Sequence, residues 1–243
     1  MSDSHDSLFA QPLGRIEGFS FDEQVARVFP DMVGRSVPGY STIVAQSGSL
    51  AERYATPGSQ VYDLGCSLGA TTLAMRRRIH APDCRIIAVD NSEPMIRRCR
   101  EAIDTDTSTV PVEVVLGDIA DVEFERASVV AMNFTLQFFA PAQRPALLKR
   151  IADGLLPGGA LILSEKIAFS DPQQQVLHTE MYHSFKRANG YSDLEISQKR
   201  SALEDVLIPD TLPAHYERLK NAGFSSAEVW FQCFNFVSII ALR

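Results

Sequence analysis

The sequence predicts a single α/β domain, residues 21–243, built on a mostly parallel sheet of seven strands. Two observations predict this class. Short runs rich in Val and Ile alternate with amphipathic helical stretches through the centre of the 243-residue chain, as expected for βαβ units. These runs are short and largely unbroken, as expected for strands buried on both faces of a parallel sheet.

The chain begins with a segment that shows no periodicity. Residues 1–20 are therefore expected to form a flexible arm. From Phe21 apolar residues recur at helical spacing, and Pro30 is expected to end this helix. A second helix is predicted over about Tyr40 to Tyr54. Together the two helices form an N-terminal helical cap, about residues 21–56.

The centre and the end of the chain supply the sheet. Five successive strands are predicted, with helices between them, at Gln60–Leu64, Arg85–Val89, Val112–Leu116, Ser128–Asn133 and Ala160–Lys166. The last two apolar runs, Glu228–Phe234 and Phe236–Leu242, are expected to form an antiparallel pair. The helices between and after these strands are predicted at Ala70–Arg78, Pro94–Ala102, Pro141–Gly154 and Ala214–Ala222.

The alternation of strand and helix fails after the fifth strand. About residues 167–212 carry helical patterns without a strand, over Gln173–Asn189 and Asp193–Val206. An insert of this length in a compact domain is usually functional, as a lid or an interface. We therefore predict a helical insert, and a homodimer that uses its surface.

Composition excludes several classes of protein. The net charge of −7 argues against a dedicated nucleic-acid-binding protein, so no direct contact with nucleic acid is expected. The four cysteines form no CxxC pair, and His178 and His183 lie five residues apart, so no metal site is predicted. The start of the chain is polar and no apolar run approaches the roughly 18–20 residues of a membrane span. A cytoplasmic protein is expected.

A glycine-rich turn follows the first predicted strand, in Asp63-Leu-Gly-Cys-Ser-Leu-Gly69. Such a turn lets the backbone approach a ligand closely, so Gly65, Cys66 and Ser67 are candidate binding residues. The second strand ends at Asp90 and Asn91. An acidic side chain at this place can accept hydrogen bonds from a ribose diol.

Two further strand ends complete the candidate site. Asp118 and Ile119 follow the third strand and suit an adenine ring, with a carboxylate for the exocyclic amine and an apolar side chain beside the ring. Asn133 ends the fourth strand. Ligands of open α/β sheets bind outside the carboxyl ends of the strands, so one nucleoside-sized ligand could reach all these residues. The turn lacks the GxGxxG pattern of nicotinamide-dependent dehydrogenases.

These motifs resemble the Rossmann-like class I methyltransferases, which bind S-adenosyl-L-methionine. The matching elements are DLGCSLG, the Val-Asp pair that ends at Asp90, the Gly-Asp pair that ends at Asp118, and LLPGG before the fifth strand. A closer resemblance covers nearly the whole chain. VPGYSTI, NFTLQF, NGYSDLEISQKRSALE and WFQCFNF are similar to segments of the carboxy-S-adenosyl-L-methionine synthase family.

The resemblance implies a reaction. In that family S-adenosyl-L-methionine and prephenate give carboxy-S-adenosyl-L-methionine and phenylpyruvate. A partner tRNA carboxymethyltransferase then uses the product to make 5-oxyacetyl-uridine at the wobble position. For this chain it implies that Gly65, Cys66 and Ser67 line the methionine portion, that Asp90 and Asn91 hold the ribose, and that Asn133 lies near the sulfonium.

The transferred carboxylate needs a cation in a site closed to water. Arg200 is the candidate for this role because a guanidinium can bind a carboxylate with two hydrogen bonds. The Tyr40 hydroxyl is a second candidate donor, or a cover for the cofactor. Lys186 and Arg187, near Tyr182, could add positive charge for prephenate.

Two other functions remain open from the residues alone. One is a conventional methyltransferase that acts on a small molecule or a tRNA. The other is a non-catalytic cofactor-binding subunit of a tRNA-modifying enzyme. The fourth strand is followed by Asn133-Phe134-Thr135-Leu136 and lacks the Asn/Asp-Pro-Pro-Tyr turn of many amine methyltransferases, which disfavours the first of these.

Overall fold

The sheet of the computed structural model, which describes residues 5–16 and 18–243, has the predicted seven-strand path. Its order is β3-β2-β1-β4-β5-β8-β7, and only β8 runs antiparallel to its neighbours, β5 and β7. A two-residue strand, β6, pairs in parallel with the end of β5. The strands are β1 Gln60–Leu64, β2 Arg85–Asp90, β3 Val112–Leu116, β4 Ala127–Asn133, β5 Leu155–Ala168, β6 Asp210–Thr211, β7 Ser226–Cys233 and β8 Phe236–Leu242.

Helices cover both faces of the sheet because the central strands are apolar on both faces. Val61, Val129 and Ile162 pack toward α2 and α3, whereas Leu64 and Leu161 pack toward α5 and α8. The helix α4 lies beside α3 on the first face. The bounds are α2 Tyr40–Tyr54, α3 Ala70–Arg76, α4 Glu93–Thr105, α5 Arg144–Gly154 and α8 Leu212–Ala222, with short 3-10 helices η1 Ile119–Asp121 and η2 Leu136–Phe138.

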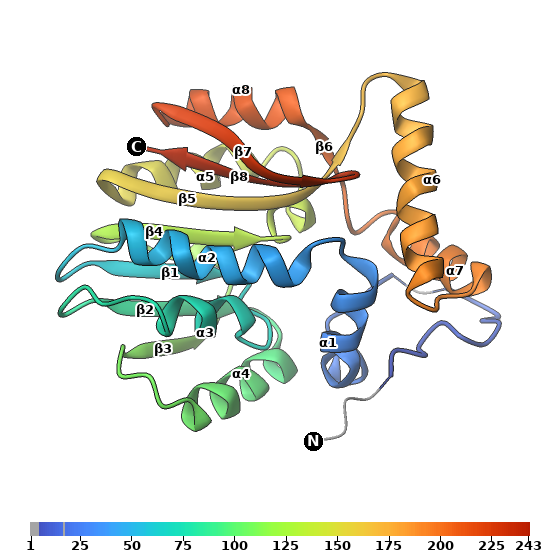
Figure 1. The fold of residues 1–243 in the computed structure, drawn as a ribbon, viewed down its shortest axis with the longest axis horizontal. Coiled ribbons are helices and arrows are strands. Elements are labelled where there is room, and N and C mark those ends of the chain that lie inside the picture. The colour runs from blue at the N-terminus through green and yellow to red at the C-terminus, as the bar shows by residue number, and fades with distance from the viewer. Residues whose placement is uncertain (1–4, 17) are drawn as a thin grey trace.

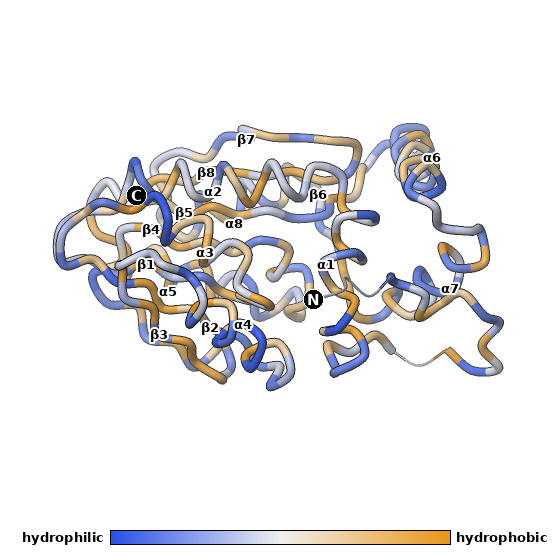
Figure 2. Tube along the Cα trace, turned by 60° about the horizontal axis from the view of Figure 1, so that its bottom comes forward, coloured by the Kyte–Doolittle hydropathy of each residue, from blue (hydrophilic) through white to orange (hydrophobic). Residues whose placement is uncertain are grey.

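Three helices lie beyond the carboxyl ends of the parallel strands (Figure 1). They are α1 Glu23–Ser36 of the cap, and α6 Pro172–Ala188 and α7 Asp193–Leu203 of the insert. Ser192 and Glu195 form a capping box that fixes the start of α7. Figure 2 shows α6 and α7 set apart from the sheet at one end of the molecule. The insert therefore encloses the edge at which open α/β sheets bind ligands.

The cap and the insert differ from the sequence prediction in two places. Pro30 was expected to end the first helix, but α1 continues through it to Ser36. The prediction is wrong because Val28 and Met32 are buried in one hydrophobic cluster, and this packing outweighs the lost backbone hydrogen bond. The insert, predicted to lack a strand, contains the short β6 because Asp210 and Thr211 pair with Ile167 and Ala168.

The described part of the predicted flexible arm is docked on α7. Asp6 is 1% exposed and accepts hydrogen bonds from the hydroxyl of Tyr191 and from Lys199. The Gln198 amide donates to the carbonyls of Phe9 and Gln11, each at 2.9 Å. The prediction for residues 1–4 and 17 falls outside the described residues. Within the described ranges, no helix combines the length and the hydropathy that crossing a membrane requires.

Candidate functional site

A cavity of about 390 Å³ lies at the carboxyl ends of β1 to β5, between the sheet, α1 and the insert. This volume lies within the usual range for small-molecule sites. The cavity brings together nine of the ten residues that the sequence singled out for ligand binding. They are Tyr40, Gly65, Cys66, Ser67, Asp90, Asn91, Asp118, Ile119 and Asn133.

The glycine-rich turn after β1 is held in one conformation by its neighbours. Gly65 has a φ of +76°, and a Cβ there would lie well inside van der Waals contact with the side chain of Thr135. The Thr135 hydroxyl donates to the carbonyl of Leu64 at 3.0 Å, which fixes this close approach. Only glycine fits this position without a shift of the chain, so the turn presents bare backbone to the cavity.

Asp90 links the ends of β1 and β2. Its Oδ2 accepts a hydrogen bond from the backbone N–H of Ser67, and its Oδ1 accepts one from Ser92, both at 2.9 Å. An ionised carboxylate offers about four acceptor positions, so two remain for a ligand. Burial raises the pKa of Asp90 above its ordinary value, although the backbone hydrogen bonds act in the opposite direction. The remaining acceptors fit the two hydroxyls of a ribose.

Asn133 is fixed at the end of β4 by three hydroxyl groups. Its Nδ2 donates to Ser47 and Thr71, each at 3.2 Å, and its Oδ1 accepts from Ser164 at 2.6 Å. The next residue, Phe134, has a φ of +59°, which is uncommon for a bulky side chain. Such strain gathers at functional sites, and here it directs the backbone beyond Asn133 along the cavity wall.

The remaining predicted residues lie at two other places in the cavity wall. Asp118 caps η1 by accepting from Ala120 N at 2.8 Å, and the adjacent Ile119 is buried, which leaves a polar edge beside an apolar surface as an adenine requires. Tyr40 begins α2. Burial, with the charge of Asp63, raises the pKa of Tyr40 to about 12, so its hydroxyl stays a hydrogen-bond donor at neutral pH.

Arg200 does not line the cavity. Its side chain is exposed on α7, although its positive charge is near enough to lower the pKa of Lys166. The neighbouring Lys199 is buried and lines the cavity instead. Arg187, the other predicted cation, forms an exposed ion pair with Asp193. The role of Arg200 stays a prediction.

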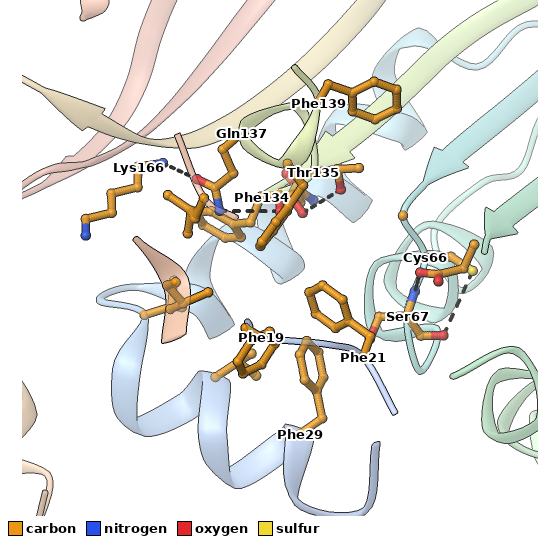
Figure 3. A pocket seen from close by; sticks show the side chains of 18 of the residues that line it. Phe19, Phe21, Phe29, Cys66, Ser67, Phe134, Thr135, Gln137, Phe139 and Lys166 are labelled. Atoms are coloured by element: carbon orange, nitrogen blue, oxygen red, sulfur yellow. Dashed lines mark hydrogen bonds between the residues drawn. The ribbon is translucent and has the colours of Figure 1, made fainter. Parts of the chain in front are cut away.

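Several cavity residues were not predicted. Lys166 follows Glu165 at the end of β5, and the rule that selected Asp90 and Asn133 would have selected it too. Figure 3 shows Phe19, Phe21 and Phe29 in the wall opposite the strand ends. Phe21 was noted only as the start of a helical pattern, and Phe19 lies before that pattern, so periodicity gave neither of them a place in the cavity wall.

A buried arginine holds the wall formed by η2. Arg144 is 1% exposed and donates to the carbonyls of Phe139 at 2.9 Å, Gln137 at 3.2 Å and Ile208 at 2.8 Å. These bonds join η2 to the end of the insert. Sequence reasoning missed this residue because its partners lie up to 66 positions away, as the ion pair with Asp210 shows.

His178 and His183 of the insert belong to no group of three or more metal-ligating side chains among the described residues. His178 stacks on Phe169 with ring centroids 4.1 Å apart. Across residues 5–16 and 18–243, no three His, Cys, Asp or Glu side chains are grouped as metal ligands.

Comparisons with known proteins agree with this geometry. A family model described as a methyltransferase domain matches residues 61–159. Solved structures with the same fold include an O-methyltransferase family protein from Burkholderia thailandensis, with a TM-score of 0.65, 17% identity and coverage of 95% of this chain and 65% of that one. Another is human N-acetylserotonin methyltransferase in complex with SAM, with a TM-score of 0.60, 18% identity and coverage of 91% and 55%.

Fold and cavity together define a Rossmann-like methyltransferase domain. Closer relatives narrow this class. A carboxy-S-adenosyl-L-methionine synthase from Trichlorobacter lovleyi is 63% identical over the full length of both chains. One from Escherichia coli is 58% identical over 98% of this chain and 96% of its own. The chain belongs to the carboxy-S-adenosyl-L-methionine synthase family.

Proposed function

We propose that the protein binds S-adenosyl-L-methionine and converts it to carboxy-S-adenosyl-L-methionine. The observation that carries the proposal is the division of one cavity into two ends. The end at Ser67, Asp90 and Asp118 offers bare backbone and carboxylate acceptors, which suit a nucleoside. The opposite end is lined by Lys166 and Lys199, which suit carboxylates. A conventional methyltransferase has no need of the second feature.

We infer that the carboxyl donor is prephenate, as in the family that the sequence resembles. The proposed reaction balances. Prephenate loses the carboxyl group and the hydroxyl group of its ring and becomes phenylpyruvate. The methyl group of S-adenosyl-L-methionine loses a proton. This proton and the hydroxyl group leave as water. The new bond joins the methyl carbon to the transferred carboxyl carbon.

The residues have separate tasks in this proposal. Asp90 and Asn91 hold the ribose, Asp118 and Ile119 hold the adenine, and Gly65, Cys66 and Ser67 line the methionine portion. Asn133 would lie near the sulfonium. Tyr40 and Arg200 would bind the carboxylate of the product, and Arg200 must then move inward or become covered when the ligand binds.

Mass spectrometry tests the proposed function. The purified protein is incubated with S-adenosyl-L-methionine and prephenate, and the nucleoside product is expected to be heavier by one CO₂ unit, with phenylpyruvate formed in equal amount. Release of S-adenosylhomocysteine with a methylated acceptor would establish a conventional methyltransferase instead. Binding of the nucleoside without turnover of either substrate would establish a non-catalytic subunit.

A tRNA carboxymethyltransferase is the proposed consumer of the product, because the carboxymethyl group is activated for transfer on the sulfonium. We propose the cytoplasm as the location, and the four cysteines are free thiols, as expected in a reducing compartment.

We also propose a homodimer formed through the insert. Val176, Leu177 and Met181 on α6 and Leu194 on α7 are large apolar side chains, each at least 39% exposed. Burial of such a patch against a second copy would remove apolar surface from water. Light scattering at micromolar concentration is expected to give twice the chain mass, and a monomer mass would reject the proposal.

A further inference from the structure

The lysine end of the cavity carries more positive charge than its surroundings balance. Lys186 and Lys199 are each 5% exposed, and Lys166 is half-buried in the cavity wall. Among the described residues, neither Lys166 nor Lys186 has a carboxylate within 4 Å. Buried charges are normally paired, because removing an ion from water costs several kcal/mol.

Among the described residues, Asp6 is the carboxylate that lies within 4 Å of any of the three lysines, and it is already engaged. Asp6 lies 3.5 Å from Lys199 and also accepts a hydrogen bond from the Tyr191 hydroxyl. It balances one ammonium group and leaves two. Burial lowers the pKa of Lys186 to about 7, with further lowering by the charges of Lys199 and Lys166. The lysine end of the cavity therefore has fewer negative than positive charges.

Aromatic rings join this charge to the nucleoside end. The Lys166 and Lys186 ammonium groups lie 5.1 Å and 4.7 Å from the centroid of the Tyr182 ring. That ring packs edge-to-face on Phe236 at 5.0 Å, and Phe236 packs on Phe134 at 6.0 Å. The ring of Phe134 lies 6.4 Å from that of Tyr40. All four rings line the cavity.

The two ends of the cavity are separate. Figure 3 shows Lys166 on the opposite side of the pocket from Cys66 and Ser67, with Phe134 between them. A cation at the lysine end can therefore hold an anion that is distinct from the nucleoside. The aromatic row between the ends suits an unsaturated carbon ring, which gains from contact with ring faces and edges and makes no demand for hydrogen bonds.

We propose that Lys166, supported by Lys186 and Lys199, forms the carboxylate subsite for the second substrate, a dicarboxylate whose unsaturated ring lies along Tyr182, Phe236 and Phe134. The inference rests on the proposed function and deepens it, because it assigns residues to the carboxyl donor. Lys166 makes the direct contact because it lines the cavity and, in the described part of the chain, no carboxylate lies within 4 Å of its ammonium group. Lys186 acts through Tyr182, as a positioning residue and a source of positive charge.

The test replaces Lys166 and Lys186 separately by methionine, which keeps the length of the side chain and removes the charge. Lys166→Met is expected to raise the KM for prephenate at least tenfold, and Lys186→Met severalfold. The dissociation constant of S-adenosyl-L-methionine, measured by calorimetry without the second substrate, should stay within threefold or decrease, because a neighbouring cation is lost. Lys149→Met, at an exposed ion pair on α5, serves as the matched control and should change neither value.

A second readout separates charge recognition from folding. The wild-type protein is expected to bind prephenate at least tenfold more tightly than its monomethyl ester, and Lys166→Met should lose most of this preference. A preference that survives in the variant would overturn the proposal. Loss of S-adenosyl-L-methionine binding in Lys166→Met would also overturn it, since the lysine would then hold the methionine carboxylate.

The failure of this inference and that of the proposed function give different results. If the wild-type protein makes the carboxylated product and the variants keep its KM for prephenate, the subsite is wrong and the function stands. If the wild-type protein binds prephenate through Lys166 but forms no carboxylated product, the subsite stands and the proposed function fails.

Discussion

Asp90 provides the sharpest test of the nucleoside end. Each of its oxygens already accepts one backbone N–H, from Ser67 and from Ser92, which leaves two acceptor positions for the ribose hydroxyls. Asp90→Ala removes both. Hydrogen bonds to a charged group contribute about 1.5–3 kcal/mol, so the dissociation constant of S-adenosyl-L-methionine is expected to rise. The rise corresponds to roughly 10- to 150-fold.

The same substitution also removes an acceptor from two backbone amides. A loss of affinity alone could therefore reflect a displaced turn. Calorimetry with S-adenosyl-L-methionine and with an analogue that lacks both ribose hydroxyls separates the two causes, as a double-mutant cycle does. The wild-type protein should bind S-adenosyl-L-methionine more tightly than the analogue by the same amount, about 1.5–3 kcal/mol. Asp90→Ala should bind the two ligands with equal affinity. Equal losses for both ligands would refute the ribose assignment.

Two controls accompany this experiment. Asp153→Ala removes an exposed carboxylate from α5 and should leave ligand affinity unchanged. The second control is pH. Because burial raises the pKa of Asp90, protonation at mildly acidic pH should weaken binding to the wild-type protein. Asp90→Ala should lack that part of the pH dependence.

Three further predictions concern single residues. If the ligand covers the guanidinium, Arg200→Ala should lower affinity for carboxy-S-adenosyl-L-methionine by about 2–4 kcal/mol more than affinity for S-adenosyl-L-methionine. Competition binding measures this difference. A difference of only about 0.2–1 kcal/mol, as for an exposed ion pair, would refute the role of Arg200. Gly65→Ala should destabilise the fold by about 1–3 kcal/mol and abolish tight ligand binding. Gly158 has a similar φ of +78°, but an added Cβ there would meet open space. The difference in the free energy of unfolding between Gly65→Ala and Gly158→Ala, measured with urea, therefore reports the contact with Thr135. Burial lowers the pKa of His215 to about 4, so the folded state binds fewer protons than the unfolded state. Stability should fall by up to about 3 kcal/mol as pH drops from about 6.5 to 4, and His215→Leu should lose that part of the dependence.

Strand positions were predictable because they depend on local pattern. β1, β3 and β8 have the predicted bounds, since each is a short apolar run bordered by polar or turn residues. The candidate site was predictable for the same reason. Parallel strands bring their carboxyl ends to one edge, so Asp90, Asp118 and Asn133 had to lie near one another.

What could not be predicted depends on contacts between distant segments. Pro30 reads as a helix end in any local pattern, and only the packing of α1 reverses that expectation. Lys199 and Arg200 are neighbours in sequence, and the orientation of α7 about its own axis decides which of them is buried. The sequence favoured Arg200 for its chemistry, whereas the orientation of the helix follows from its docking on Asp6 and Tyr191.

The docked N-terminal segment has a consequence for the order in which the chain assembles during synthesis. Residues 9–13 leave the ribosome long before Gln198, whose side chain holds their backbone. Domains begin to fold as they emerge, so β1 to β4 can pair while α7 is still unmade. Until α7 has been made, residues 9–13 therefore wait without this partner. The cavity gains Lys199 only when α7 has been made, and the nascent enzyme cannot close around a substrate before then.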